Sequence, residues 1–229
     1  MLRARVNELA SSHVIGPSEI RDVYIQGWEA AASHLLADGV LSVDEEHHLA
    51  EFMDHFGLSQ AELDRHGMHS KVAKAAVLRD LMQGKLPQRI KVAGGLPFSL
   101  LKTEHLIWLF TDVGYLEDQV RREYVGRSSG LSIRLAKGVY YRVGAFRGHP
   151  VTKTDRVHVD TGLLGVTNKH LYFAGPLKSF RVRHDKIVSI MPFSDGAGIV
   201  RDAASAKPQV FVTGDGWFTV NLLADAAQV

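Results

Sequence analysis

The segment from Asp160 to Val182 constrains the fold of this 229-residue chain more than any other part of its sequence. It consists of short runs of alternating apolar residues, interrupted by Thr167-Asn168-Lys169 and then by Gly175-Pro176. Alternation with a period of two is typical of half-buried strands, and the interrupting residues are typical of tight turns. The segment therefore predicts a meander of antiparallel strands.

Strand-like runs continue on both sides of this segment. We expect strands over 104–115, 131–136, 139–146, 163–166, 171–173, 180–182, 187–191, 199–201, 210–213 and 218–222. The strands 131–136 and 139–146 would form a hairpin around Lys137-Gly138. Asp195-Gly196 and Asp215-Gly216 are dipeptides that favour hairpin turns, so we expect turns there too. A short terminal helix is expected to begin at Leu222.

The first half of the chain has the period of a helix instead. One helix is expected from Pro17 to Gly39, a second from Ser42 to Gly57, and a further helical stretch from Ser59 to Gly84 with a break near Gly67. Ser42 with Glu45, and Ser59 with Glu62, have the spacing of capping boxes. The expected buried stripes are Val23, Tyr24, Trp28, Ala31 and Leu35 on the first helix, and Leu49, Phe52, Met53 and Phe56 on the second.

The two patterns are separated by a segment that suits neither. Residues 85–97 contain Pro87, Gly94, Gly95 and Pro97, which interrupt both helices and strands. We therefore predict an α+β protein with two domains: a helical bundle over 1–90 and an antiparallel β domain over 91–229.

Charge divides the chain in a similar way. Residues 1–119 have 11 Lys and Arg against 17 Asp and Glu, whereas residues 120–229 have 16 against 8. The halves could attract each other within the molecule, or the basic half could meet an anionic surface. There is no cysteine, no apolar run long enough to span a membrane and no apolar stretch of a signal peptide at the start, so we expect a cytoplasmic protein.

Sequence motifs of catalysis are missing. The chain has neither a G-x-S-x-G elbow nor a G-x-x-x-x-G-K-[ST] phosphate loop. The aromatic residues of the basic half, such as Tyr172 and Phe173, fall in strand runs expected to pack in the core, and no RNP-like motif is present. We therefore expect no catalysis, no cofactor and no nucleic-acid partner.

The twelve histidines raise the question of a metal site. Asp44, His48, Glu51 and His55 share one face of the expected second helix, but this face lies opposite the apolar stripe and H-E-x-x-H is absent. Aligning Gly39 with the turn glycine of a calcium loop would put Leu36, which has no side-chain oxygen, at a ligand position. We predict a solvated or inter-domain face and no metal site.

A basic strand supplies the candidate contact residues. Alternation over 178–183 buries Phe180 and Val182 and directs Arg181 and Arg183 to the other face, with Lys178 at the start of the strand. Lys169 and Lys186 are expected nearby. Lys178, Arg181 and Arg183 are the predicted partner-binding or lipid-binding residues. Ordinary solvated cations are the alternative.

Two resemblances to known families add to this interpretation. The segment G-L-L-G-V-T-N-K-H-L-Y-F at 162–173 resembles the central hairpins of the pleckstrin-homology-like (PH-like) and GRAM superfamily. This resemblance implies two packed antiparallel sheets, a sandwich or barrel, with a C-terminal helix and a binding role. The phrase A-D-G-V-L-S-V-D-E at 37–45 is similar to the tellurite-resistance B-like (TerB-like) helical family, which implies a link to metal binding and stress responses.

The functional prediction follows from these observations together. We expect a non-catalytic recognition or adaptor protein that binds a protein partner or an anionic membrane surface, at which it would be peripheral. The alternative is a metal-binding stress-response protein that acts through its helical domain.

Overall fold

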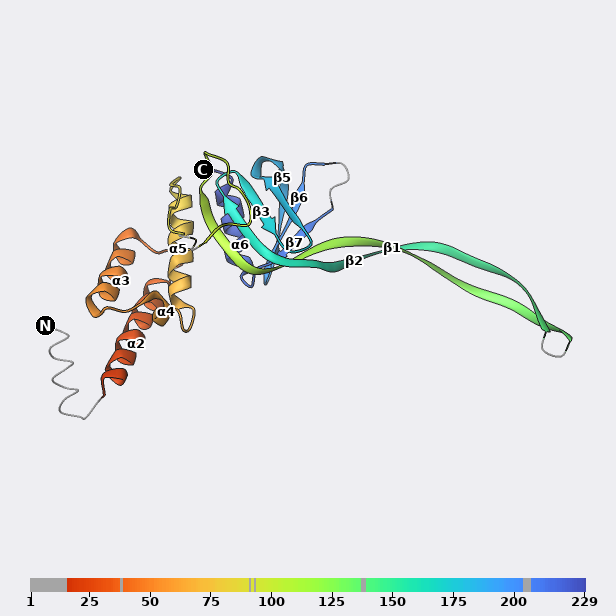
Figure 1. Ribbon diagram of the computed structural model, residues 1–229, viewed down its shortest axis with the longest axis horizontal. Coiled ribbons are helices and arrows are strands. Elements are labelled where there is room, and N and C mark those ends of the chain that lie inside the picture. The colour runs from red at the N-terminus through yellow and green to blue at the C-terminus, as the bar shows by residue number, and fades with distance from the viewer. Residues whose placement is uncertain (1–15, 38, 91, 93, 137–138, 204–206) are drawn as a thin grey trace.

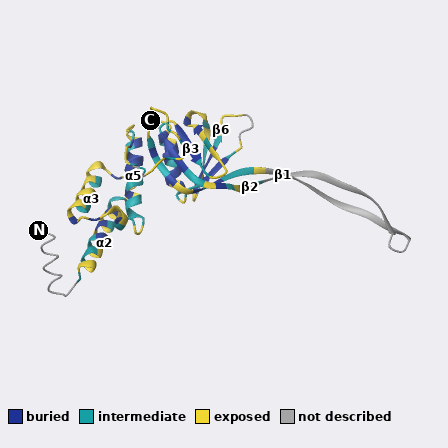
Figure 2. Cartoon of the chain, viewed as in Figure 1, coloured by how far each residue is buried: buried dark blue, intermediate teal, exposed yellow. Residues whose placement is uncertain are grey.

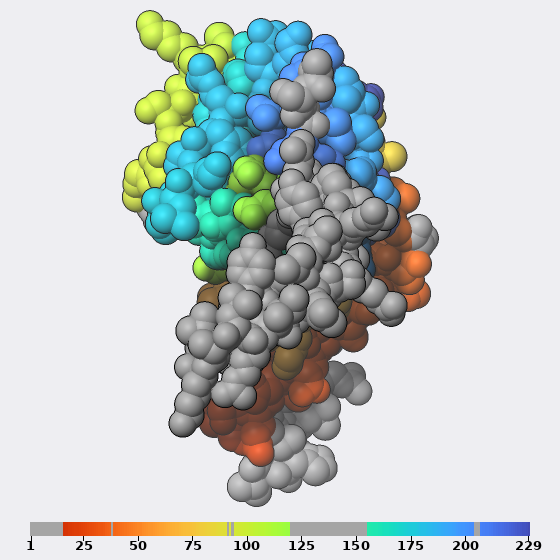
Figure 3. Space-filling model, turned by 90° about the vertical axis from the view of Figure 1, so that its right-hand side faces the viewer, coloured from red at the N-terminus to blue at the C-terminus, as the bar shows by residue number. Residues whose placement is uncertain are grey.

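The computed structural model describes residues 16–37, 39–90, 92, 94–136, 139–203 and 207–229, with side chains described outside 120–154. The fold is α+β, as predicted: N-terminal helices are followed by a seven-stranded antiparallel sheet and a C-terminal helix (Figure 1). In the view of Figure 3 the N-terminal helices form the lower end of the molecule and most of the sheet forms the upper end. Among the described residues, no helix is long and apolar enough to cross a membrane.

The helical end contains α2 (Pro17–Leu35), α3 (Val43–Phe56), α4 (Gln60–Leu63) and α5 (Met68–Met82). Both predicted capping boxes are confirmed, since the side chains of Ser42 and Ser59 accept bonds from the amides three residues on. The predicted end of α3 and the predicted break are confirmed at Gly57 and Gly67, which have φ of 61° and 73°. Glycine adopts this left-handed conformation without steric cost. α2 ends at Leu35, earlier than predicted.

The core of the helical end is built around Trp28, whose Nε1 donates a hydrogen bond of 3.0 Å to the Leu49 carbonyl. The stripe predicted for α2 was partly wrong, because Val23 and Ala31 are exposed. The buried residues are instead Ile25, Trp28 and Ala32. These three residues lie at i, i+3 and i+7, a spacing that places them on one side of the helix, facing its neighbours.

The strands are β1 (Leu106–Ala136), β2 (Val139–Thr167), β3 (His170–Ala174), β4 (Ser179–Arg183), β5 (Ile187–Phe193), β6 (Gly196–Arg201) and β7 (Gln209–Val212). Their order in the sheet is β4-β3-β2-β1-β7-β6-β5, and every neighbouring pair is antiparallel. The meander predicted between 160 and 182 is confirmed as β2, β3 and β4.

β1 and β2 are much longer than the sequence predicted. They pair from Leu106 opposite Thr167 to Ala136 opposite Val139, and beyond the sheet they continue as a two-stranded ribbon (Figure 1). We expected separate strands here, because apolar alternation marks only strands that bury one face. The predicted turn at Lys137-Gly138 lies outside the described residues.

The final predicted strand was wrong, because residues 218–222 belong to the helix α6 (Gly216–Ala226). Asp215-Gly216 is therefore the start of a helix and not a hairpin turn. The Asp215 carboxylate accepts a hydrogen bond of 3.1 Å from the Phe218 amide, which is the bond of a helix N-cap. The apolar run Phe218–Leu223 was open to either interpretation, since periodicity does not separate a short buried strand from a buried helix.

The hairpin between β5 and β6 is present, but its turn differs from the prediction. Its loop residues are Ser194 and Asp195, and Gly196 already pairs with Phe193 as the first residue of β6. Gly196 is needed for space, since a Cβ there would lie 1.9 Å from the Phe211 carbonyl oxygen.

Helix α5 joins the two ends of the molecule. Val72 and Ala76 pack in the helical core, whereas Val77, Leu78 and Leu81 pack in the core of the sheet. Burial is high along α5 and in the centre of the sheet (Figure 2). The predicted domain boundary after residue 90 stays a prediction, but α5 contributes to the cores on both sides.

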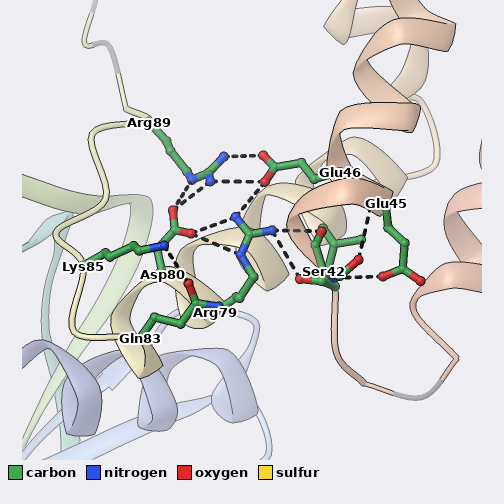
Figure 4. A network of polar contacts seen from close by, with 9 residues as sticks. Ser42, Glu45, Glu46, Arg79, Asp80, Gln83, Lys85 and Arg89 are labelled. Carbon is green, nitrogen blue, oxygen red and sulfur yellow. Dashed lines mark hydrogen bonds and ion pairs between the residues drawn. The ribbon is translucent and has the colours of Figure 1, made fainter.

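A network of ion pairs and hydrogen bonds between side chains connects α5 to the rest of the helical end (Figure 4). The Arg79 side chain, only 8% exposed, donates to Glu46 and Asp80 at 2.7 Å each and to the carbonyls of Leu41 and Ser42. Arg89, beyond the end of α5, pairs with the same two carboxylates. Each carboxylate thus meets two guanidinium groups, and α3, α5 and the following segment are held together.

We expect Arg79→Met to reduce the free energy of unfolding by about 3 kcal/mol, because it leaves buried carbonyls and carboxylates short of a partner. Urea denaturation followed by circular dichroism measures this loss. Arg65→Met is the control, since Arg65 pairs with Asp22 at 3.4 Å on the surface and should contribute less than about 1 kcal/mol. Equal losses in the two variants would contradict the role given to Arg79.

Candidate functional site

A mainly apolar cavity of about 690 Å³ forms a groove between α5 and α6. The loop after α2 closes one side of it through Leu36, Val40 and Leu41. Its floor and walls are mainly apolar, and Leu78 and Phe218 belong to the residues that line it. A mainly apolar concave site of this size is typical of places where proteins bind ligands or partner side chains.

Three large apolar side chains at this groove face solvent. Val40 is 61% exposed, Met82 is 77% exposed and Trp217 is 68% exposed. They come from the loop after α2, from the end of α5 and from the start of α6, so three separate segments contribute. Single exposed apolar residues are common on any surface, but a set that borders one cavity is typical of an interaction site.

The charges of the groove are distributed unevenly. Lys74 bonds Asp215 at 2.7 Å and lies 5.2 Å from the centre of the Phe218 ring, so this cation is already engaged. Lys71 and Asp225 have no ion-pair partner among the described residues. Burial raises the pKa of the Asp225 carboxyl.

The predicted contact residues lie on or beside β4, the edge strand of the sheet. Val182 is buried and Phe180 half-buried, whereas Arg181 and Arg183 are exposed, so the predicted alternation is confirmed. Lys178 is separated from the two arginines, because it has the parity of Phe180 and its Nζ lies 3.7 Å from Glu117. Arg183 makes a bidentate pair with Asp185.

The two arginines line a second cavity of about 510 Å³. The turn between β2 and β3 adds Asn168 and Lys169, and the short 3₁₀ helix at His184–Lys186 adds His184 and Asp185. Lys178 is not among the lining residues.

Behind this cavity lies a buried carboxylate, Glu104. It accepts hydrogen bonds of 2.7 Å from the Tyr172 hydroxyl and from the Leu101 amide, and it also bonds the His170 ring. Burial alone would raise the pKa of Glu104, but the bonds from Leu101, Tyr172 and His170 outweigh it and lower that pKa. The carboxylate therefore holds the segment before β1 against β3.

The same segment covers the outer face of the sheet through Phe98. Its ring stacks on Tyr172 with centroids 4.8 Å apart and lies over Gly165, where a Cβ would meet the ring at 2.5 Å. Gly165 thus leaves room for Phe98, and together with Glu104 this contact positions the segment beside the cavity.

The face of α3 considered for a metal is solvated. Asp44, His48, Glu51 and His55 are all exposed. Across the described part of the chain, no group of three or more His, Asp or Glu side chains is arranged to hold a metal ion.

Sequence reasoning missed the groove, because it treated α6 as a strand. The available signal was Asp215 before the apolar run 216–223, since an aspartate immediately before such a run is a frequent helix N-cap. No sequence pattern could show that the exposed faces of α5 and α6 lie side by side, because that depends on how these two helices pack against each other.

Comparison with known proteins identifies no relative: no family model matches the chain, and no curated protein or solved structure does either.

We expect Glu104→Gln to lower the free energy of unfolding by about 1–3 kcal/mol at pH 7, because the charged acceptor is lost. A carboxyl whose pKa is lowered on folding stabilises the protein above its unfolded pKa, about 4.3, and this contribution disappears as the pH falls through the folded pKa. The gap between wild type and Glu104→Gln should therefore shrink when urea denaturation is repeated at successively lower pH below 4. A gap that stays constant, or a similar pattern in the exposed-site control Glu51→Gln, would contradict this.

We expect Gly165→Ala to cost about 1–3 kcal/mol by displacing the Phe98 ring. In a Phe98→Ala background the added methyl meets no ring, so the same substitution should cost less than half as much. The four unfolding free energies of this cycle measure the coupling. Equal costs in both backgrounds would show that Phe98 does not lie over Gly165.

Proposed function

We propose that this chain is a non-catalytic recognition protein that binds an apolar segment of a protein partner in the groove between α5 and α6. The observation that carries the proposal is the convergence of Val40, Met82 and Trp217, all more than half exposed, on one apolar cavity. Covering these side chains with a partner removes apolar surface from water, which is the main favourable term in most protein association. Large aromatic residues such as Trp217 are also enriched among the residues that dominate binding energy.

The charges of the groove specify the partner further. Asp225 is a partly buried carboxylate without a counter-ion among the described residues, and Lys71 is an exposed cation that also lacks one there. An amphipathic helical segment with apolar residues at i, i+3 or i+4, and i+7, and with a lysine or arginine facing Asp225, complements this surface. An acidic residue opposite Lys71 would add to the fit.

We also propose that the sheet and α6 form a PH-like or GRAM-like domain, in which the two ends of the sheet pack as a sandwich or barrel and α6 covers the open side. The strand order β4-β3-β2-β1-β7-β6-β5 and the burial of Phe218, Leu222 and Leu223 on α6 support this proposal. The capping box at Ser42 supports the likeness of the helical end to TerB-like domains. The absence of catalysis and the cytoplasmic location stay predictions.

Selection from a displayed library of 16-residue peptides tests the groove directly. We expect selected peptides to contain apolar residues at helical spacing and at least one basic residue, and to bind the chain as synthetic peptides. Met82→Ser with Trp217→Ser should weaken their binding by about tenfold or more, because both exposed anchors are lost.

The matched control is Leu177→Ser, since Leu177 is also 77% exposed and apolar but lies between β3 and β4. Peptide binding should be unchanged in this variant. The proposal fails if the library gives no binders, or if the selected peptides bind the groove variant as well as the wild type.

A further inference from the structure

The cavity beside β4 combines cations from different parts of the sheet. Arg181 and Arg183 point to the same face of β4, and Lys169 joins them from the turn between β2 and β3. Asp185 is the single carboxylate among the lining residues, so three cations face one anion. The cavity therefore has an excess of positive charge.

Two of these cations have no ionic partner among the described residues. The Lys169 amine donates to the neutral hydroxyl of Thr103 at 2.6 Å, and Arg181 makes no ion pair. Arg183, in contrast, is engaged by Asp185 at 2.6 Å. Arg181 also interacts with the Tyr172 hydroxyl, which is neutral. The charges of Lys169 and Arg181 are thus not neutralised by a carboxylate, while Arg183 is held by Asp185 beside them.

A buried histidine adds a second, independent feature. His184 lines the cavity, is only 7% exposed, and donates from Nε2 to the Thr167 carbonyl at 2.7 Å. Its Nδ1 has no hydrogen-bond partner within the described part of the chain. Because Nε2 carries the proton, Nδ1 is an acceptor, and buried acceptors in native proteins usually have a partner.

We propose that this cavity is a binding site for a phosphomonoester. A phosphate ester has a charge of about −1.5 to −2 at neutral pH and three acceptor oxygens, which suit the planar Arg181 guanidinium and the Lys169 ammonium together. The remaining volume of the cavity accommodates the group to which the phosphate is attached, and a hydroxyl of that group, or of the phosphate itself, donates to His184 Nδ1. The sequence pointed to the arginines of β4 with Lys169 nearby, but it did not place His184 with them.

This site is independent of the groove proposed for a protein partner. The two cavities have no lining residue in common, since one is formed by α5, α6 and the loop after α2 and the other by the edge of the sheet with its adjoining turns. Loss of binding at one site should therefore leave the other unaffected.

Isothermal titration calorimetry with glycerol 3-phosphate and with inorganic phosphate tests the proposal. We expect saturable binding of glycerol 3-phosphate to the full chain, with affinity reduced by about tenfold or more in Arg181→Gln and in Lys169→Gln, because each removes one charge-assisted contact. Both positions are exposed, so the variants should fold, and their melting temperatures verify this.

Lys178→Gln is the matched control. It removes the same charge from the same edge of the sheet, but outside the cavity, so the affinity should stay within about twofold of wild type. If Lys178→Gln weakens binding as much as Arg181→Gln, the protein attracts anions through its overall charge and the proposed site is wrong. Absence of saturable binding by either phosphate compound would overturn the proposal as well.

Vesicles separate the two sources of a phosphomonoester. A site that reads a lipid head group will bind vesicles containing phosphatidic acid more strongly than vesicles with phosphatidylserine at equal surface charge, and Arg181→Gln will remove the difference. A site for a soluble ligand will bind glycerol 3-phosphate and treat the two vesicle types alike.

Discussion

The connection between the two ends of this protein, and the groove beside it, depend on the packing of α5 between the N-terminal helices and α6. One side of this helix supplies Val72 and Ala76 to the helical core, and another supplies Val77, Leu78 and Leu81 to the core of the sheet. A fully buried side chain of this kind contributes about 1.5–3 kcal/mol, so the three residues facing the sheet form a substantial connection. The ion pairs of Arg79 fix the same helix to α3, which orients its remaining side toward α6.

The groove is a consequence of this arrangement. The groove is lined by Ala75, Leu78 and Met82 of α5, together with α6 and the loop after α2. Because α6 buries Phe218 and Leu222 against the sheet, Trp217 remains outside. Neither core buries the exposed apolar residues of the groove. This surface is therefore available to a partner.

The sequence predicted the parts of the fold that depend on local interactions. Ser42 and Ser59 determine where two helices begin, and Gly57 determines where one ends. The alternation around Val182 determines which side of β4 faces the core. All of these features depend on residues only a few positions apart. The errors concern residues whose state depends on distant partners. Phe218 and Leu222 suit a strand or a helix until the sheet beneath them is known, and no local pattern relates Met82 to Trp217, which the packing of α5 beside α6 brings to one groove.

The measurement that tests the central role of α5 most directly is urea unfolding observed by NMR at individual tryptophan indoles. Trp28 reports on the helical core, and Trp108, which packs on Phe218, reports on the core of the sheet. If α5 couples the two cores as its packing implies, both indole signals should disappear in a single transition with the same midpoint. A Trp28 signal that is lost at clearly lower urea concentration, while that of Trp108 persists, would show that the two ends unfold separately and that α5 does not hold the groove in place.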